Sequence, residues 1–147
     1  MRITYRGDYA LKAILELALR FGGEQAPTIN EIAKHLDIPS KFLEQILLDL
    51  KRGGFVESRR GKIGGYFLSK PPKQIRLGEV VRFIDGPIEP VSCVDRKYKG
   101  CKDLRSCVFR HIWAQVAAST ASIIDNITFE DLAKEAKQSE TVLSYSI

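Results

Sequence analysis

Three cysteines, Cys93, Cys101 and Cys107, lie close together and are the only cysteines among the 147 residues of the chain. Seven residues separate the first two, and five separate the last two. Zinc sites usually pair their cysteines about two to four residues apart, so this spacing argues against a zinc finger. Thiolates are also the preferred ligands of iron–sulfur clusters, and a loop of three can surround a larger inorganic core.

The segment that carries the cysteines is rich in cations, which offset the negative charge of a thiolate-ligated cluster. These cations are Arg96, Lys97, Lys99, Lys102 and Arg105. Three thiolates leave the coordination one ligand short. His111 follows Cys107 by four residues, so both side chains could face one site if a helix begins by Leu104. Asp8 is the other candidate for the fourth ligand, provided that a partner subunit supplies it.

Two further uses of the cysteines stay open. A thiol–disulfide switch would need the same three side chains and no metal. A cysteine nucleophile with His111 as its base would need an oxyanion hole and a substrate pocket, and no motif for either accompanies it. We therefore expect neither an enzyme nor a small-molecule substrate.

Upstream of the cysteines, the sequence predicts a helix-turn-helix. Residues 8–21 form an apolar-faced helix that stops at Gly22-Gly23. Thr28 and Glu31 have the spacing of a capping box, which opens a short second helix. After the tight turn at residues 37–40, a third helix carries apolar residues at helical spacing: Phe42, Leu43, Ile46, Leu47 and Leu50. Two short helices joined by a tight turn are typical of a helix-turn-helix.

A β-hairpin is predicted directly after the third helix. Residues 55–59 and 65–69 are strand candidates, and the glycines of the intervening 60–64 segment allow the turn that a hairpin needs. A hairpin in this place is the wing of a winged helix. We therefore expect residues 1–72 to form a winged helix-turn-helix DNA-binding region.

The predicted reading helix and wing supply the candidate DNA contacts. The exposed early positions of the helix are Ser40, Lys41, Glu44 and Gln45, and the cations of the hairpin are Arg59, Arg60 and Lys62. Ser, Glu and Gln can hydrogen-bond base edges in the major groove, whereas arginine and lysine suit phosphates or the minor groove. One alternative is that Glu44 only pairs with Lys41 on a solvated face.

Residues 73–147 are expected to hold a connecting helix, the cysteine loop, a dimerisation helix and a C-terminal helix. The connecting helix spans residues 75–84, and a long helix runs from about Leu104 to Asn126. The apolar seam of the long helix alternates steps of four and three: Phe109, Trp113, Val116, Thr120, Ile123 and Ile127. It indicates a homodimer, with a purely internal core helix as the alternative. A last helix from Thr128 to about Lys137 precedes a loosely tethered end.

Charge and composition agree with this interpretation. The net charge of +5 and the pI near 9.2 favour a polyanionic partner. The first residues lack a secretory signal, and Lys12, Glu16 and Arg20 interrupt the only apolar run near them, so no membrane association is expected. An odd cysteine count without a signal favours the reducing cytoplasm.

Together these motifs resemble the Rrf-two family of winged-helix regulators, which includes IscR-type and NsrR-type iron–sulfur repressors. The resemblance rests on the three-cysteine loop before a tryptophan-bearing helix and on three motifs: Asp8-Tyr9-Ala10-Leu11, Leu43-Glu44-Gln45-Ile46-Leu47 and Gly64-Gly65-Tyr66-Phe67-Leu68. The implied fold is mainly α with a small β-hairpin: a winged helix-turn-helix domain plus a long dimerisation helix.

The resemblance implies a homodimer on a partly palindromic DNA operator, with a [2Fe-2S] or [4Fe-4S] cluster on the three cysteines. It places Ser40, Glu44, Gln45 and Arg60 at DNA-contacting positions. Asp8 falls where NsrR-like members supply a carboxylate ligand across the dimer. IscR-like members use a histidine three residues after the last cysteine, where this chain has Arg110, with His111 one residue later. Some members keep the fold without a cluster.

The sequence thus predicts a dimeric transcription regulator whose operator affinity is tuned by an iron–sulfur cluster. A cluster-free thiol/disulfide redox-switch regulator is the main alternative. A cysteine-dependent enzyme or a protein-interaction module that does not bind DNA is the third.

Overall fold

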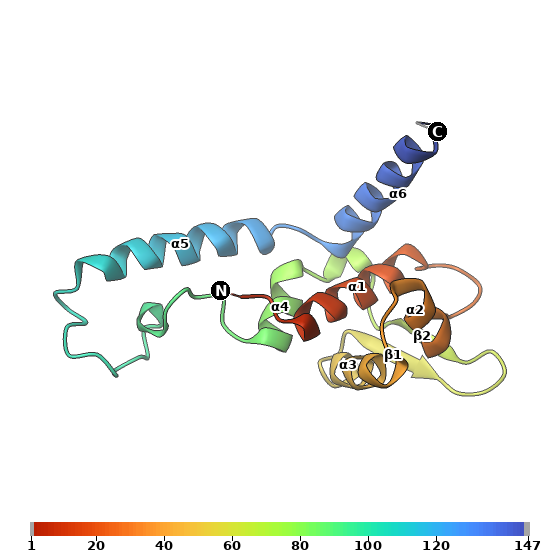
Figure 1. Cartoon of the computed structure of the whole chain (residues 1–147), viewed down its shortest axis with the longest axis horizontal. Helices are drawn as coiled ribbons and strands as arrows, with labels where there is room; N and C mark the ends of the chain where they lie inside the picture. The colour runs from red at the N-terminus through yellow and green to blue at the C-terminus, as the bar shows by residue number, and fades with distance from the viewer. Residues whose placement is uncertain (1, 146–147) are drawn as a thin grey trace.

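Helix α1 (Tyr5–Leu19) lies at the centre of the core in the computed structural model, which describes residues 2–145 (Figure 1). It contacts α2, α3, α4, α6 and β2, and it buries Ala10, Ala13 and Ile14 completely. The helix begins three residues earlier than predicted because Thr4 caps it: the Thr4 hydroxyl accepts a 3.0 Å hydrogen bond from the Gly7 amide.

The predicted helix-turn-helix is confirmed. Helix α2 (Ile29–Leu36) opens with the Thr28–Glu31 capping box, in which the Glu31 carboxylate accepts a 2.6 Å hydrogen bond from the Thr28 amide. Asp37 takes the left-handed conformation, φ 53°, which turns the chain sharply into α3 (Ser40–Arg52). The buried face of α3 completes the core against α1 through Leu43, Ile46, Leu47 and Leu50.

The predicted hairpin is also confirmed. Strands β1 (Val56–Arg59) and β2 (Gly65–Leu68) pair antiparallel, with Val56 opposite Leu68 and Arg59 opposite Gly65. Val56 and Leu68 are buried, so their ends of the strands join the core, while the turn at 60–64 extends away from it.

The core continues past residue 72. After the 3-10 turn η1 (Pro72–Gln74), helix α4 (Leu77–Asp85) packs on α1, with Val80 fully buried. Helix α6 (Phe129–Tyr145) returns Phe129 to the same core, and the Thr128 hydroxyl accepts a 3.2 Å hydrogen bond from the Asp131 amide at its start. The predicted end of this helix near Lys137 is wrong, since α6 continues to Tyr145.

Helix α5 (Val108–Ile124) extends away from the body formed by α1–α4, at the end of the long segment that holds η2 (Ser92–Val94) (Figure 1). The predicted start of this helix near Leu104 is wrong. The amides of Ser106 and Cys107 both donate to the Asp103 carbonyl, which forms a turn and makes Cys107 the N-cap residue.

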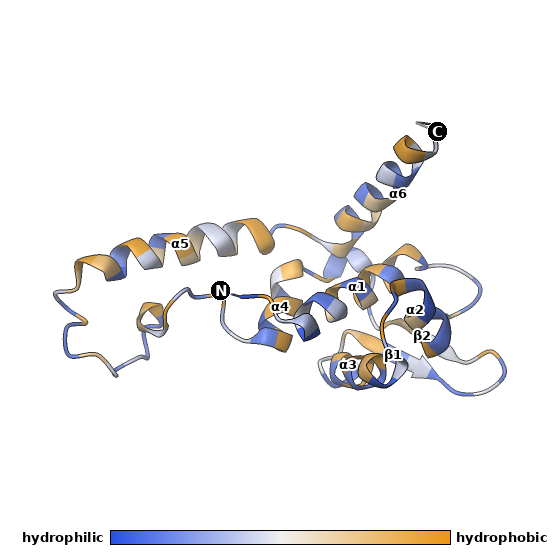
Figure 2. Cartoon of the chain, viewed as in Figure 1, coloured by the Kyte–Doolittle hydropathy of each residue, from blue (hydrophilic) through white to orange (hydrophobic). Residues whose placement is uncertain are grey.

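No residue of α5 is buried, although apolar residues run along it (Figure 2). The fold class is therefore as predicted, mainly α with one two-stranded hairpin and a long helix. Within residues 2–145, no helix combines the length and the apolar character that crossing a bilayer requires.

Candidate DNA-binding surface and cysteine loop

The four candidate base-reading residues of α3 are all exposed. They are Ser40, Lys41, Glu44 and Gln45. The opposite face of α3 is buried in the core, so the polar face must point outward. No ion pair joins Glu44 to Lys41 in the described part of the chain, so both side chains are available to a partner.

A cleft separates α3 from the hairpin. Its α3 side is lined by Glu44, Leu48 and Lys51, and its hairpin side by Ser58, Arg59 and Arg60. Lys51 Nζ donates a 2.8 Å hydrogen bond to Ser58 Oγ, which ties the two elements at the end of the cleft. Of the predicted residues, Glu44 of the helix and Arg59 and Arg60 of the wing therefore line one cleft.

Next to its turn, the hairpin is anchored through strand β2 to the segment that precedes α2. The Tyr66 amide donates to the Pro27 carbonyl at 2.9 Å, and an added Cβ on Gly65 would lie 2.4 Å from the Ala26 carbonyl oxygen. Only glycine at position 65 lets the wing approach that closely. Arg60 and Lys62, in the turn that leads into Gly65, are both exposed.

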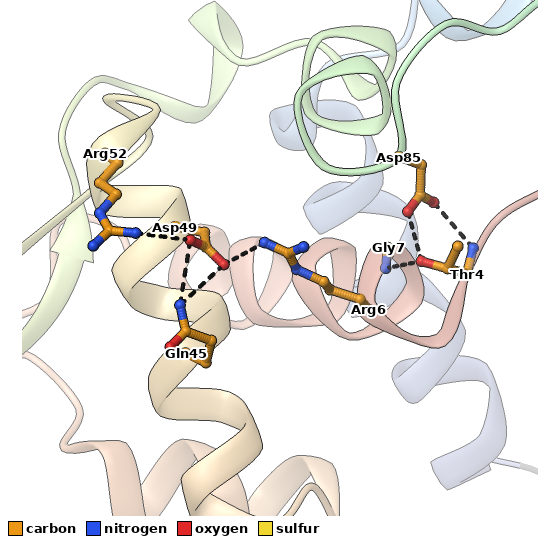
Figure 3. Close-up of polar contacts among 7 residues, drawn as sticks. All are labelled: Thr4, Arg6, Gly7, Gln45, Asp49, Arg52 and Asp85. Carbon is orange, nitrogen blue, oxygen red and sulfur yellow. Dashed lines mark hydrogen bonds and ion pairs between the residues drawn. The ribbon is translucent and has the colours of Figure 1, made fainter.

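Gln45 lies differently from its neighbours on α3. Its amide faces Asp49, one turn later, at 3.4 and 3.5 Å from the two carboxylate oxygens (Figure 3). Asp49 is buried and also pairs with Arg6 of α1 and with Arg52. The contacts from Gln45 are at the long limit for a hydrogen bond, so its amide can turn towards a base at small cost.

The three cysteines occupy different environments in their loop. Cys93, in η2, and Cys107, at the start of α5, are half-buried, and Cys101 is exposed. All three are free thiols. Arg110 joins the two ends of this loop, because its Nε donates to the Cys93 carbonyl at 2.7 Å and its Nη1 to the Leu104 carbonyl at 3.4 Å.

The two candidates for a fourth ligand lie on separate helices. Asp8 is in the first turn of α1, where its carboxylate accepts a 2.7 Å hydrogen bond from Lys12 and raises the pKa of that lysine. His111 is exposed in the first turn of α5. Across residues 2–145, no three potential metal-ligating side chains form a ready-made site, so the structure does not bring the predicted ligands together.

The comparisons with known proteins agree with this geometry. A family model described as Rrf2, an iron-dependent transcriptional regulator, matches residues 3–135. The chain belongs to the Rrf2 family. An rrf2-like HTH-type transcriptional regulator from Rhodobacter capsulatus is 46% identical over 136 residues, which cover 88% of this chain and 91% of that protein.

Solved structures of Rrf2-like regulators have the same fold as this chain. CymR, the global cysteine regulator of B. subtilis, matches with a TM-score of 0.75 and 31% identity over 92% of this chain and 98% of its own. T. potens IscR matches with a TM-score of 0.75 and 27% identity over 95% of this chain and 90% of its own. The Rrf2-family protein is therefore a DNA-binding transcription regulator, and the prediction that it is no enzyme is confirmed.

Two carboxylates join helix α4 of this Rrf2-family protein to its neighbours. The Asp85 carboxylate accepts hydrogen bonds from the Thr4 amide at 3.0 Å and the Thr4 hydroxyl at 2.5 Å, which ties α4 to the start of α1 (Figure 3). The carboxylate of Asp125, at the end of α5, accepts two hydrogen bonds from Arg82: Nη1 donates to Oδ1 at 2.6 Å, and Nη2 donates to Oδ2 at 2.8 Å. Helix α4 therefore connects the end of α5 to the start of α1.

The sequence analysis did not identify the residues that make these ties. Asp49 had a signal, since a carboxylate beside the apolar stripe of α3 needs a buried partner. Arg82 and Asp125 had none, because they are 43 positions apart and neither stands out among the charged residues of the sequence.

The contribution of the Arg82–Asp125 pair to folding stability is expected to depend on pH. The hydrogen bond from Arg82 lowers the pKa of Asp125. Stability from this pair is therefore present above the unfolded-state pKa of the carboxyl and is lost as the pH falls through its lowered folded-state pKa. We expect Arg82→Ala to raise the pKa of Asp125 in a carboxyl NMR titration.

Asp131 provides the internal control, because Thr128 and not Arg82 lowers the pKa of its carboxyl. Its titration should be the same in both proteins. An Asp125 titration that does not move in Arg82→Ala would contradict the observed pairing.

Proposed function

We propose that this regulator is a homodimer whose operator affinity is set by an iron–sulfur cluster held by Cys93, Cys101 and Cys107. The observation that carries the proposal is the presence of three free thiols in one cation-rich loop that leads directly into α5. In this proposal residues 1–72 bind DNA, and residues 73–147 sense the signal and form the dimer.

The donor set suits an iron–sulfur cluster by its chemistry. Three thiolates supply the usual ligands, and the surrounding lysines and arginines compensate their charge. His111 of the same chain or Asp8 of a second copy would complete the coordination. A bound cluster would supply a redox-active centre that oxidants can remove.

The chain's own contacts offer a route from the loop to the reading helix. The loop continues into α5, Asp125 ties α5 to α4, and Asp85 ties α4 to Thr4 of α1. Arg6 of α1 then pairs with Asp49 of α3. A coupling of about 1–3 kcal/mol along this route would change operator affinity roughly 5- to 150-fold.

The dimer is proposed from the uncovered apolar face of α5. Val116 and Trp113 are 42% and 39% exposed, and Phe109 and Ile123 are each 62% exposed. These positions follow the coiled-coil-like seam of the sequence, so a second α5 is the occupant whose pattern matches. Two reading helices related by a two-fold axis would then meet the two halves of a palindromic operator.

Substitutions on the DNA-binding surface should separate phosphate contacts from base contacts. Arg60→Ala should weaken binding to every duplex and reduce the salt slope by about one, because it removes a phosphate contact. Glu44→Ala should instead relax base preference by about 1–3 kcal/mol at one position. Fluorescence anisotropy over a salt series, with duplexes selected from a randomised library, measures both effects.

Lys137→Ala is the matched control, because it removes an exposed cation from α6. It should change neither affinity nor base preference. If Arg60→Ala binds every duplex as tightly as the unmodified protein does, the assignment of the wing to DNA is wrong.

The proposed dimer interface on α5 can be tested separately from DNA binding. Val116→Glu should produce a monomer in analytical ultracentrifugation, because it places a charge in the middle of the α5 seam. Ala118→Glu adds the same charge to the opposite side of the helix and should leave the dimer intact. A Val116→Glu protein that sediments as the unmodified one does would remove α5 from the interface.

Anaerobic reconstitution with ferrous iron and sulfide tests the cluster. We expect visible absorption with bound iron and sulfide, which any of the Cys→Ser variants should lose or reduce strongly. Asp8→Ala and His111→Ala then identify the fourth ligand by which of them shifts the spectrum.

A colourless, iron-free protein would eliminate the cluster and favour the thiol-switch alternative. Mass spectrometry after mild oxidation should then find a disulfide between two of the three cysteines. Cys→Ser variants that respond normally to oxidant would in turn eliminate the switch.

A further inference from the structure

Arg110 is the residue that closes the cysteine loop. The other hydrogen bonds inside residues 93–107 of the described chain are local, such as those from the Tyr98 amide to the Asp95 carbonyl and from the Cys107 amide to the Asp103 carbonyl. The bond from Arg110 to Cys93 spans 17 positions and joins the beginning of the loop to the helix that ends it.

The geometry of this closure is specific. Arg110 lies in the first turn of α5, where its amide donates to the Cys107 carbonyl at 3.3 Å. Its half-buried side chain reaches back so that Nε donates to the Cys93 carbonyl at 2.7 Å, while Nη1 faces the Leu104 carbonyl at 3.4 Å. The backbone of Cys93 is therefore held against the turn that follows Cys107.

The exposure of the cysteines agrees with this arrangement. Cys93 and Cys107, at the two ends that Arg110 joins, are half-buried, whereas Cys101, between them, is exposed. Cys93 and Cys107 thus lie at the two ends of the loop that Arg110 joins, and Cys101 lies in the exposed part between them.

We propose that Arg110 is a positioning residue that presets Cys93 relative to Cys107, independently of any bound metal. The proposal deepens the proposed function, because it concerns the same three cysteines. A guanidinium suits this task since its planar fork offers several donors in fixed directions, whereas a lysine ammonium acts as a point charge on a flexible stem. Arg110 positions Cys93 through directed hydrogen bonds, and a positive charge at position 110 without these bonds does not position it.

Thiol–disulfide exchange measures this preset geometry directly. In a full-length Cys101→Ser protein, the Cys93 and Cys107 thiols react with oxidised glutathione to give the intramolecular disulfide and two molecules of reduced glutathione. Two electrons and two protons pass from the protein to glutathione, so the equation balances. The equilibrium constant gives the effective concentration of one thiol towards the other.

In that background, we expect Arg110→Ala to lower the effective concentration about two- to ten-fold, the loss expected for one intramolecular hydrogen bond on a half-exposed side chain. Arg110→Lys should lose most of the same factor, because it keeps the charge without the fork. Arg105→Ala is the matched control: it removes an exposed cation from the same loop and should leave the value unchanged.

Equal losses in Arg110→Ala and Arg105→Ala, with full rescue by Arg110→Lys, would show a charge effect and overturn the proposal. An unchanged value in Arg110→Ala would overturn it as well. Circular dichroism of each variant establishes that α5 is retained, so that a lower value reports on the loop. The measurement uses metal-free protein, and a failure of cluster reconstitution in the unmodified chain would therefore leave this result standing.

Discussion

Two carboxylates, Asp85 and Asp125, join α4 to the start of α1 and to the end of α5. The exposed ion pair between Arg82 and Asp125 contributes only about 0–1 kcal/mol to stability, so its role is chiefly geometric. Each carboxylate fills a space that a glycine leaves open. A Cβ on Gly7 would lie 2.1 Å from Asp85 Oδ2, and a Cβ on Gly78 would lie 2.0 Å from Asp125 Oδ1. A larger residue at either glycine would displace the carboxylate beside it, so both contacts depend on a glycine at that position.

In the proposed DNA-binding surface, α3 is held by more contacts than the tip of the hairpin is. The buried face of α3 sets the direction in which its polar residues point, and Lys51 fixes the distance to the hairpin through Ser58. Arg60 and Lys62 are left without such restraint at the tip of the wing. A rigid helix beside an adaptable pair of cations suits a surface that must read bases in one place and follow a phosphate backbone in another.

The sequence predicted those parts of the structure that depend on neighbouring residues. The capping box at Thr28 and the alternation of apolar residues in α3 are local patterns, and the elements that they predict are present. The start of α5 was misplaced because the turn at Asp103 breaks a segment whose composition alone favours a helix. The ties made by Arg82, Asp49 and Arg110 could not be predicted, since each depends on residues that only the folded chain brings together. The chemistry of the cysteines is visible in the sequence, but their different degrees of exposure are not.

Because no residue of α5 is buried, the stability of this helix in the cell would depend on the concentration of the protein. Most helical stability in proteins comes from packing of an apolar face, and a single copy of the chain gives the 17 residues of α5 little of that stabilisation. Pairing would order the helix and, through Arg110, the segment before it. Under the proposed assembly, a newly synthesised chain at low abundance would stay incompetent until it met another. Gene dosage would then determine how much of the population can respond at all, before any stimulus arrives.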